Sequence, residues 1–173
     1  MRNRNIYIVV AGLCLIAIAL ATNACKKDAD FIPTGCDDTN PVENCGTPTP
    51  YNFQVPFRFP QPPPTPNNPL TVEGIALGRK LFYETKLSAN NTQSCASCHA
   101  QTFGFTDNGL KFSLGIDGIP GNRNSMAIVN LAWAKDLFWD GREKTLEDQA
   151  FAPVTNPIEM HNTWPNAVAT LQA

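Results

Sequence analysis

Apolar positions recur at helical spacing in several short segments of the second half of the chain. The first follows Thr71, where Val72 and Ile75 begin an apolar stripe, and it predicts a helix over residues 71–84 with Thr71 as its N-cap. Gly78 lies on the same stripe. Because glycine destabilises a helix interior, we expect it to allow close packing against another helix.

Three further helices are predicted downstream. One covers residues 126–133, and one begins at Thr145, with Asp148 three residues later approximating a capping box. The last begins at Thr163, with Pro165 in the first turn, where proline is tolerated. No alternating strand pattern of useful length is present, so the predicted fold class is all-α, with short helices joined by long loops.

The N-terminus has the pattern of a targeting segment. Arg2 and Arg4 precede an uninterrupted apolar run over residues 6–21. A helix of that run measures roughly 24 Å, whereas a membrane-spanning helix needs roughly 30 Å. Residues 1–24 are therefore interpreted as a signal peptide, and we expect a periplasmic or cell-envelope protein.

Cys25 follows this segment directly and resembles a bacterial lipoprotein processing site, with Cys25 as the lipidated first residue. Such a lipid would anchor the chain to the membrane. The third residue before the cysteine is Thr22, where these sites prefer leucine. Ordinary cleavage after Ala24, releasing a soluble periplasmic product, is the alternative.

Residues 25–67 are predicted to be a proline-rich disordered tether. Eleven of the 15 prolines of the chain lie between Pro33 and Pro69. Proline fixes φ and lacks an amide donor, so this composition favours an extended, semi-rigid spacer. Cys36 and Cys45 could form a disulfide in an oxidising compartment, and this pairing stays open.

The length and the net charge of the chain limit the size of the domain after the tether and the kind of partner it can bind. The chain has 173 residues and a net charge of −2. Residues 68–173 suffice for one modest domain, and the charge gives no surface for a polyanion, so no nucleic-acid partner is expected.

The motif Cys95-Ala-Ser-Cys98-His99 indicates the chemistry of this domain. Two cysteines three positions apart can each attach to a vinyl group of one porphyrin, and the adjacent histidine then reaches the iron as an axial ligand. A redox-active cysteine pair normally follows a strand, and a zinc site needs two more ligands. A structural disulfide leaves His99 without a role. We therefore predict a cytochrome c-like domain with one covalent haem c.

The sixth iron ligand decides between two functions. Met160 lies 61 positions after His99, a spacing compatible with a mono-haem electron carrier that has His99/Met160 axial ligation. An open sixth position would instead allow reaction with a substrate. Spacing alone leaves both alternatives open.

Further motifs over residues 69–171 resemble the bacterial di-haem cytochrome c peroxidase family, which includes the methylamine-utilisation di-haem enzymes. The resemblance is carried by short runs on both sides of the haem motif: Leu77-Gly-Arg-Lys-Leu-Phe82, Phe105-Thr-Asp107, Gly121-Asn-Arg-Asn-Ser125, Phe138-Trp-Asp-Gly-Arg142, Gln149 and Asn156-Pro-Ile-Glu-Met160. It implies the N-terminal haem domain of that family, where hydrogen peroxide is reduced to water.

The resemblance also implies residue roles. Glu159 corresponds to the distal carboxylate, Gln149 to a distal amide and Trp139 to the tryptophan between the two haems. Asn124 corresponds to a position that helps to hold calcium. A carboxylate suits the reaction, because the near oxygen of peroxide must lose a proton and the far oxygen must gain one. By residue type alone, Glu159 could be a surface residue, Trp139 a core aromatic and Asn124 a turn residue.

One departure from the family concerns the loop that follows a Ser-x-Gly sequence. Many members carry a histidine there that blocks the peroxide site, whereas this chain has Ile116. We therefore expect an open, high-spin haem that needs no reductive activation. His161 is the remaining candidate for a blocking ligand.

Family members also carry a second Cys-x-x-Cys-His domain, which is missing from this chain. We expect that the chain was truncated before that domain. The resemblance further implies a small cytochrome or cupredoxin as electron donor.

Overall fold

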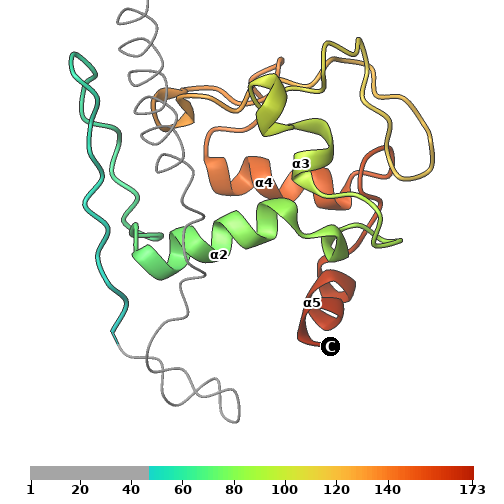
Figure 1. Cartoon of the computed structure of the whole chain (residues 1–173), viewed down its shortest axis with the longest axis horizontal. Helices are drawn as coiled ribbons and strands as arrows, with labels where there is room; N and C mark the ends of the chain where they lie inside the picture. The colour runs from blue at the N-terminus through green and yellow to red at the C-terminus, as the bar shows by residue number, and fades with distance from the viewer. Residues whose placement is uncertain (1–46) are drawn as a thin grey trace, which may run out of the picture. The chain divides into compact units, whose positions relative to one another are not determined.

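The computed structural model describes residues 47–173 (Figure 1). The predicted signal peptide, the lipidation site at Cys25 and the pair Cys36 and Cys45 lie outside the described residues. In residues 47–173 no helix is long and apolar enough to cross a membrane.

The first described helix, α2 (Val72–Tyr83), confirms the prediction made from Thr71. Thr71 is the N-cap, and its hydroxyl accepts a hydrogen bond of 3.0 Å from the Gly74 amide. Gly78, however, is exposed, and a methyl group added there would meet no atom of another described segment within 4 Å. The expectation that Gly78 packs closely against another helix is therefore wrong for this part of the chain.

The N-caps predicted for the two later helices are also confirmed. Helix α4 (Leu146–Thr155) starts after Thr145, which accepts from the Asp148 amide at 3.1 Å. Helix α5 (Trp164–Gln172) starts after Thr163 with a proline in its first turn. Between α2 and α4 lie the haem-motif helix α3 (Cys95–Cys98) and the single 3₁₀ turns η1 (Thr85–Leu87), η2 (Gln101–Phe103) and η3 (Leu131–Trp133).

The helix predicted over residues 126–133 is wrong apart from η3. The Ile128 amide donates to the Phe105 carbonyl at 3.3 Å instead of to a helical partner. Asn130 has a φ of 54°, which no α-helix accommodates. These contacts attach the segment to the loop after the haem motif.

A small hydrophobic core lies where α5 packs against η1. It comprises Leu87, Val154, Met160 and Ala167, each less than 7 % exposed. The described residues contain isolated β-bridges but no named strand, so the all-α prediction is confirmed for them.

The proline-rich segment before α2 contacts the helical part. The indole Nε1 of Trp133 donates to the Pro60 carbonyl at 2.8 Å. The rings of Phe59 and Phe53 lie 4.7 and 6.0 Å from the Trp133 ring, centroid to centroid. The predicted domain boundary at residue 68 and the tether before it stay predictions, but residues 53–60 are in contact with the domain.

Candidate haem-binding site

A mostly apolar cavity of about 300 Å³ lies beside α3. Its wall contains the residues to which the sequence assigned a catalytic, haem-binding or calcium-binding role: Cys95, Cys98, His99, Asn124, Trp139, Gln149 and Glu159. The fold thus brings together residues separated by up to 64 positions. Their chemical roles stay predictions.

The short helix α3 presents the two thiols. The Ser94 amide donates to the Ser97 hydroxyl at 3.1 Å, which fixes the start of this single turn. Cys95 and Cys98 both carry free thiols, and burial raises the pKa of each. Both therefore hold their protons at neutral pH.

His99 ends the same turn with its ring held from one side. Its Nδ1 lies 3.2 Å from the Phe105 carbonyl. A carbonyl only accepts, so Nδ1 carries the proton and Nε2 keeps a lone pair. Burial lowers the pKa of His99, against the opposing effect of backbone hydrogen bonds with Phe105 and Met126. A neutral imidazole with a lone pair on Nε2 is the form that binds iron, and Nε2 here lies 3.4 Å from the Ser125 hydroxyl oxygen.

Glu159 lies elsewhere on the cavity wall, after α4. Its Oε1 accepts a hydrogen bond of 2.8 Å from the Asn156 side chain. Burial raises the pKa of Glu159, while the Arg142 charge and the Asn156 hydrogen bond act in the opposite direction. A half-buried carboxyl with a raised pKa can act first as a proton acceptor and then as a proton donor.

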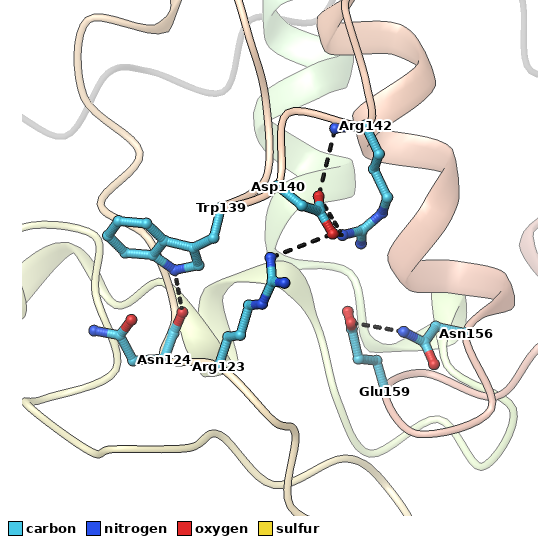
Figure 2. Close-up of polar contacts among 7 residues, drawn as sticks. All are labelled: Arg123, Asn124, Trp139, Asp140, Arg142, Asn156 and Glu159. Atoms are coloured by element: carbon cyan, nitrogen blue, oxygen red, sulfur yellow. Dashed lines mark hydrogen bonds and ion pairs between the residues drawn. The ribbon is translucent and has the colours of Figure 1, made fainter.

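Two arginines that line the same cavity share one aspartate (Figure 2). Asp140 accepts from Arg142 at 3.0 and 3.1 Å and forms an ion pair with Arg123 at 3.2 Å. The Arg142 guanidinium also lies 3.4 Å from the centre of the Phe138 ring. Arg142 is therefore held in place next to Glu159.

Trp139 lies at the exposed edge of the cavity, with 60 % of its surface accessible. Its indole Nε1 donates to the Asn124 carbonyl at 2.9 Å (Figure 2). That bond orients the indole and engages the backbone carbonyl of Asn124.

The calcium prediction at Asn124 has no cluster of acidic ligands beside it. No group of three or more His, Cys, Asp or Glu side chains that could hold a metal occurs in residues 47–173. Calcium at Asn124 stays a prediction.

The two other candidate iron ligands differ in position. Met160 is 4 % exposed and belongs to the core cluster, although it also contributes to the cavity wall. The exposed His161 ring is hydrogen-bonded to Asp117 at 2.6 Å and is not among the residues lining the cavity of the described domain. Ile116 does not line it either.

The family model for di-haem cytochrome c peroxidase matches residues 72–173. This range covers the cavity and all the helices from α2 to α5. The chain belongs to the di-haem cytochrome c peroxidase family. The resemblance stated from the motifs is thereby confirmed.

Individual relatives are similar to more than half of the chain. The methylamine utilization protein MauG of Methylorubrum extorquens is 42 % identical over 118 residues, which cover 68 % of this chain and 33 % of that protein. The cytochrome c peroxidase Ccp of Escherichia coli is 42 % identical over 105 residues, which cover 60 % and 22 %. The chain thus spans about a third or less of the length of these relatives.

A solved structure shows the similarity in three dimensions. A MauG-like protein associated with microbial copper homeostasis superimposes with a TM-score of 0.65 at 37 % identity. The match covers 70 % of this chain and 35 % of that one.

The residues present fit the haem c that this peroxidase family implies. Two free thiols and an imidazole with an available Nε2 face one largely apolar cavity, which is the donor set that a covalent porphyrin requires. The Gln93 Oε1 atom is buried in the same wall without a hydrogen-bond partner in the described structure. This oxygen is therefore an acceptor in the cavity wall that can receive a hydrogen bond from a bound group.

Several residues of the site received no role from the sequence. Arg142 and Asn156 stand in the quoted motifs, so the resemblance could have singled them out. Ser125 likewise ends the quoted Gly121–Ser125 run; it donates to the Cys98 carbonyl at 2.7 Å and lies 3.1 Å from His99 Nδ1. Only the folded arrangement shows its contact with the haem motif.

Proposed function

We propose that this chain forms a peroxide-reducing haem c domain, in which hydrogen peroxide is reduced to water with electrons from a small cytochrome or cupredoxin. The observation that carries the proposal is that Glu159, with a raised pKa, shares one cavity with Cys95, Cys98 and His99. Family membership supports it, because the relatives include proteins named cytochrome c peroxidases.

When bound through Cys95 and Cys98, haem c supplies redox chemistry at an iron atom ligated by His99 Nε2. Glu159 accepts a proton from the near oxygen of hydrogen peroxide and returns it to the far oxygen, so that water can leave. Asn156 orients the carboxylate during both transfers. Gln149 lines the same cavity and can hydrogen-bond to the peroxide.

Electrons are proposed to enter through Trp139. Its exposed indole lies at the cavity edge and is oriented by the Asn124 carbonyl. In this proposal Asn124 also contributes to a calcium site, as the resemblance implies. The exposure of Trp139 leaves room for a second haem domain or a donor protein to approach it.

Replacing the proposed acid–base group tests the function. We predict that Glu159→Gln in the haem-loaded chain lowers the second-order rate constant for hydrogen peroxide by about 10² or more, because the amide cannot accept the proton. Stopped-flow spectroscopy measures this rate. Glu143→Gln is the matched control, since Glu143 lies outside the cavity wall. Equal rates for Glu159→Gln and the unmodified chain would refute the proposal.

The electron-carrier function remains the second candidate, because Met160 lines the same cavity as His99. The burial of Met160 among Leu87, Val154 and Ala167 supports a packing role instead. A methionine–iron bond gives a weak near-infrared band in the ferric protein, whereas the proposed open site gives a high-spin spectrum. The near-infrared band would favour the carrier.

We also propose export to the periplasm or cell envelope, with a lipid anchor at Cys25. Covalent haem attachment outside the cytoplasm is consistent with the N-terminal targeting pattern. Mass spectrometry of the mature chain tests the proposal together with the haem. We expect one haem adduct and a lipidated N-terminus at Cys25, and an unmodified N-terminus after Ala24 would exclude the anchor.

A further inference from the structure

Residues 113–121, here called the distal loop, form a closed turn beside the cavity. The Gly115 amide donates to the Ile119 carbonyl at 3.0 Å, and the Gly121 amide to the Ser113 carbonyl at 3.0 Å. The loop therefore has a defined shape of its own. It can act on neighbouring residues as a unit.

The distal loop is in contact with the backbone of Glu159. The Ile116 amide donates to the Glu159 carbonyl at 3.0 Å. A methyl group added to Gly115 would overlap the Ile158 carbonyl oxygen and lie 2.8 Å from the Glu159 carbonyl oxygen. Only glycine permits this approach, so the loop and residues 158–159 are in direct backbone contact.

A side-chain pair joins the same two segments on the solvent side. The Asp117 carboxylate accepts from His161 Nδ1 at 2.6 Å. His161 lies two residues after Glu159, and its φ of 48° is uncommon for a residue other than glycine. The pair thus holds the chain just after Glu159 in a conformation that most residues avoid.

The other side of the loop is attached to the haem motif. The Gln93 Nε2 atom donates to the Leu114 carbonyl at 2.8 Å and lies 3.5 Å from the Cys98 sulfur. The distal loop therefore bridges the attachment site of the porphyrin and the backbone of the proposed acid–base residue.

We infer that the distal loop fixes the Glu159 carboxylate relative to the haem attachment site, with Asp117 and Gly115 as positioning residues for the peroxide reaction. This inference rests on the proposed function of Glu159. Asn156 orients the end of the Glu159 side chain, whereas the loop fixes the backbone from which that side chain starts. Proton transfer depends steeply on such placement, since a displacement of about 1 Å can cost on the order of 10² in rate.

Removing the Asp117 carboxylate is the direct test. We expect Asp117→Ala to speed hydrogen exchange of the Ile116 amide about tenfold or more, because the loop opens more often. We also expect it to lower the rate constant for hydrogen peroxide about tenfold. Asp117→Asn keeps an acceptor oxygen for His161 and should restore most of both values. Asp136→Ala is the matched control, since it removes an exposed ion pair with Lys144 outside the cavity wall.

Gly115→Ala tests the same contact by introducing a steric clash with residues 158–159. Gly78→Ala is the control, because a methyl group added at Gly78 meets no other segment within 4 Å. We expect a loss on the order of 10² in peroxide rate for the former and none for the latter. If Asp117→Ala changes neither hydrogen exchange nor rate, the inference is wrong. If Glu159→Gln keeps full activity while Asp117→Ala still speeds exchange, the proposed function fails but the structural contact stands.

Discussion

Glu159 is subject to two opposing influences, and their balance sets the pH at which it can act. Burial raises the pKa of its carboxyl, and the positive charge of Arg142 lowers it. Only the ionised carboxylate can accept the first proton from hydrogen peroxide. The peroxide rate should therefore rise with pH through the Glu159 pKa, which lies above its ordinary value.

Arg142→Gln should shift the rising part of the pH–rate profile, called here the rising limb, to higher pH. The substitution removes the charge that favours the ionised carboxylate, so the pKa of Glu159 rises further. The measurement is the pH profile of the second-order rate constant with hydrogen peroxide. Arg123→Gln is a fitting control, because Arg123 shares Asp140 with Arg142 but is not among the causes of the Glu159 shift. A limb that moves to lower pH, or equally in both variants, would contradict this explanation.

At the scale of secondary structure, the elements with local end signals were predictable. Thr71, Thr145 and Thr163 cap the three longest described helices, and each hydroxyl accepts from an amide in the first turn. A capping contact spans only three residues, so sequence can reveal it. Residues 126–133 have helical apolar spacing, yet their backbone bonds to the loop after the haem motif, a partner that spacing does not show.

Asn162 illustrates a second kind of contact that the sequence does not reveal. Its side chain is buried, donates to the Leu87 carbonyl at 2.9 Å and accepts from the Thr163 amide and the Asn166 side chain at 2.8 Å each. This single residue joins the start of α5 to η1, 75 positions earlier. An asparagine before a helix looks like an ordinary turn residue until its distant partner is known.

The residues of the candidate site likewise fall into those that the sequence identifies and those whose contacts only the structure shows. The cysteines and histidine of the haem motif, and Glu159 within its run, could be identified because each stands in a contiguous pattern. The contacts of the distal loop with residues 158–161 join segments about 44 positions apart. The Ser-x-Gly pattern that includes Gly115 associates this loop with the peroxide site, but no local signal indicates its backbone contact with residues 158–159 or the contact of Asp117 with His161.

For the described domain as a whole, the packed core is small and the cavity lies beside it. The buried apolar residues of this part are Leu87, Leu137, Val154, Met160 and Ala167. So few residues bury little apolar surface for a domain of this length. A large flat porphyrin, held through two covalent bonds, would add buried surface where the chain itself supplies least.

The proline-rich segment before α2 contributes a second packed region, and this can be measured. Phe59 lies on Trp133, whose indole is bonded to the Pro60 carbonyl. An aromatic pair contributes about 0.5–1.5 kcal/mol beyond its burial, so Phe59→Ala should lower the free energy of unfolding by about 1 kcal/mol or more. Urea unfolding followed by circular dichroism measures the change. Phe57→Ala is the control, because Phe57 is 88 % exposed and should leave the midpoint unchanged. Equal midpoints for both variants would mean that residues 53–60 behave as the free tether expected from their composition, with no stabilising contact to the domain.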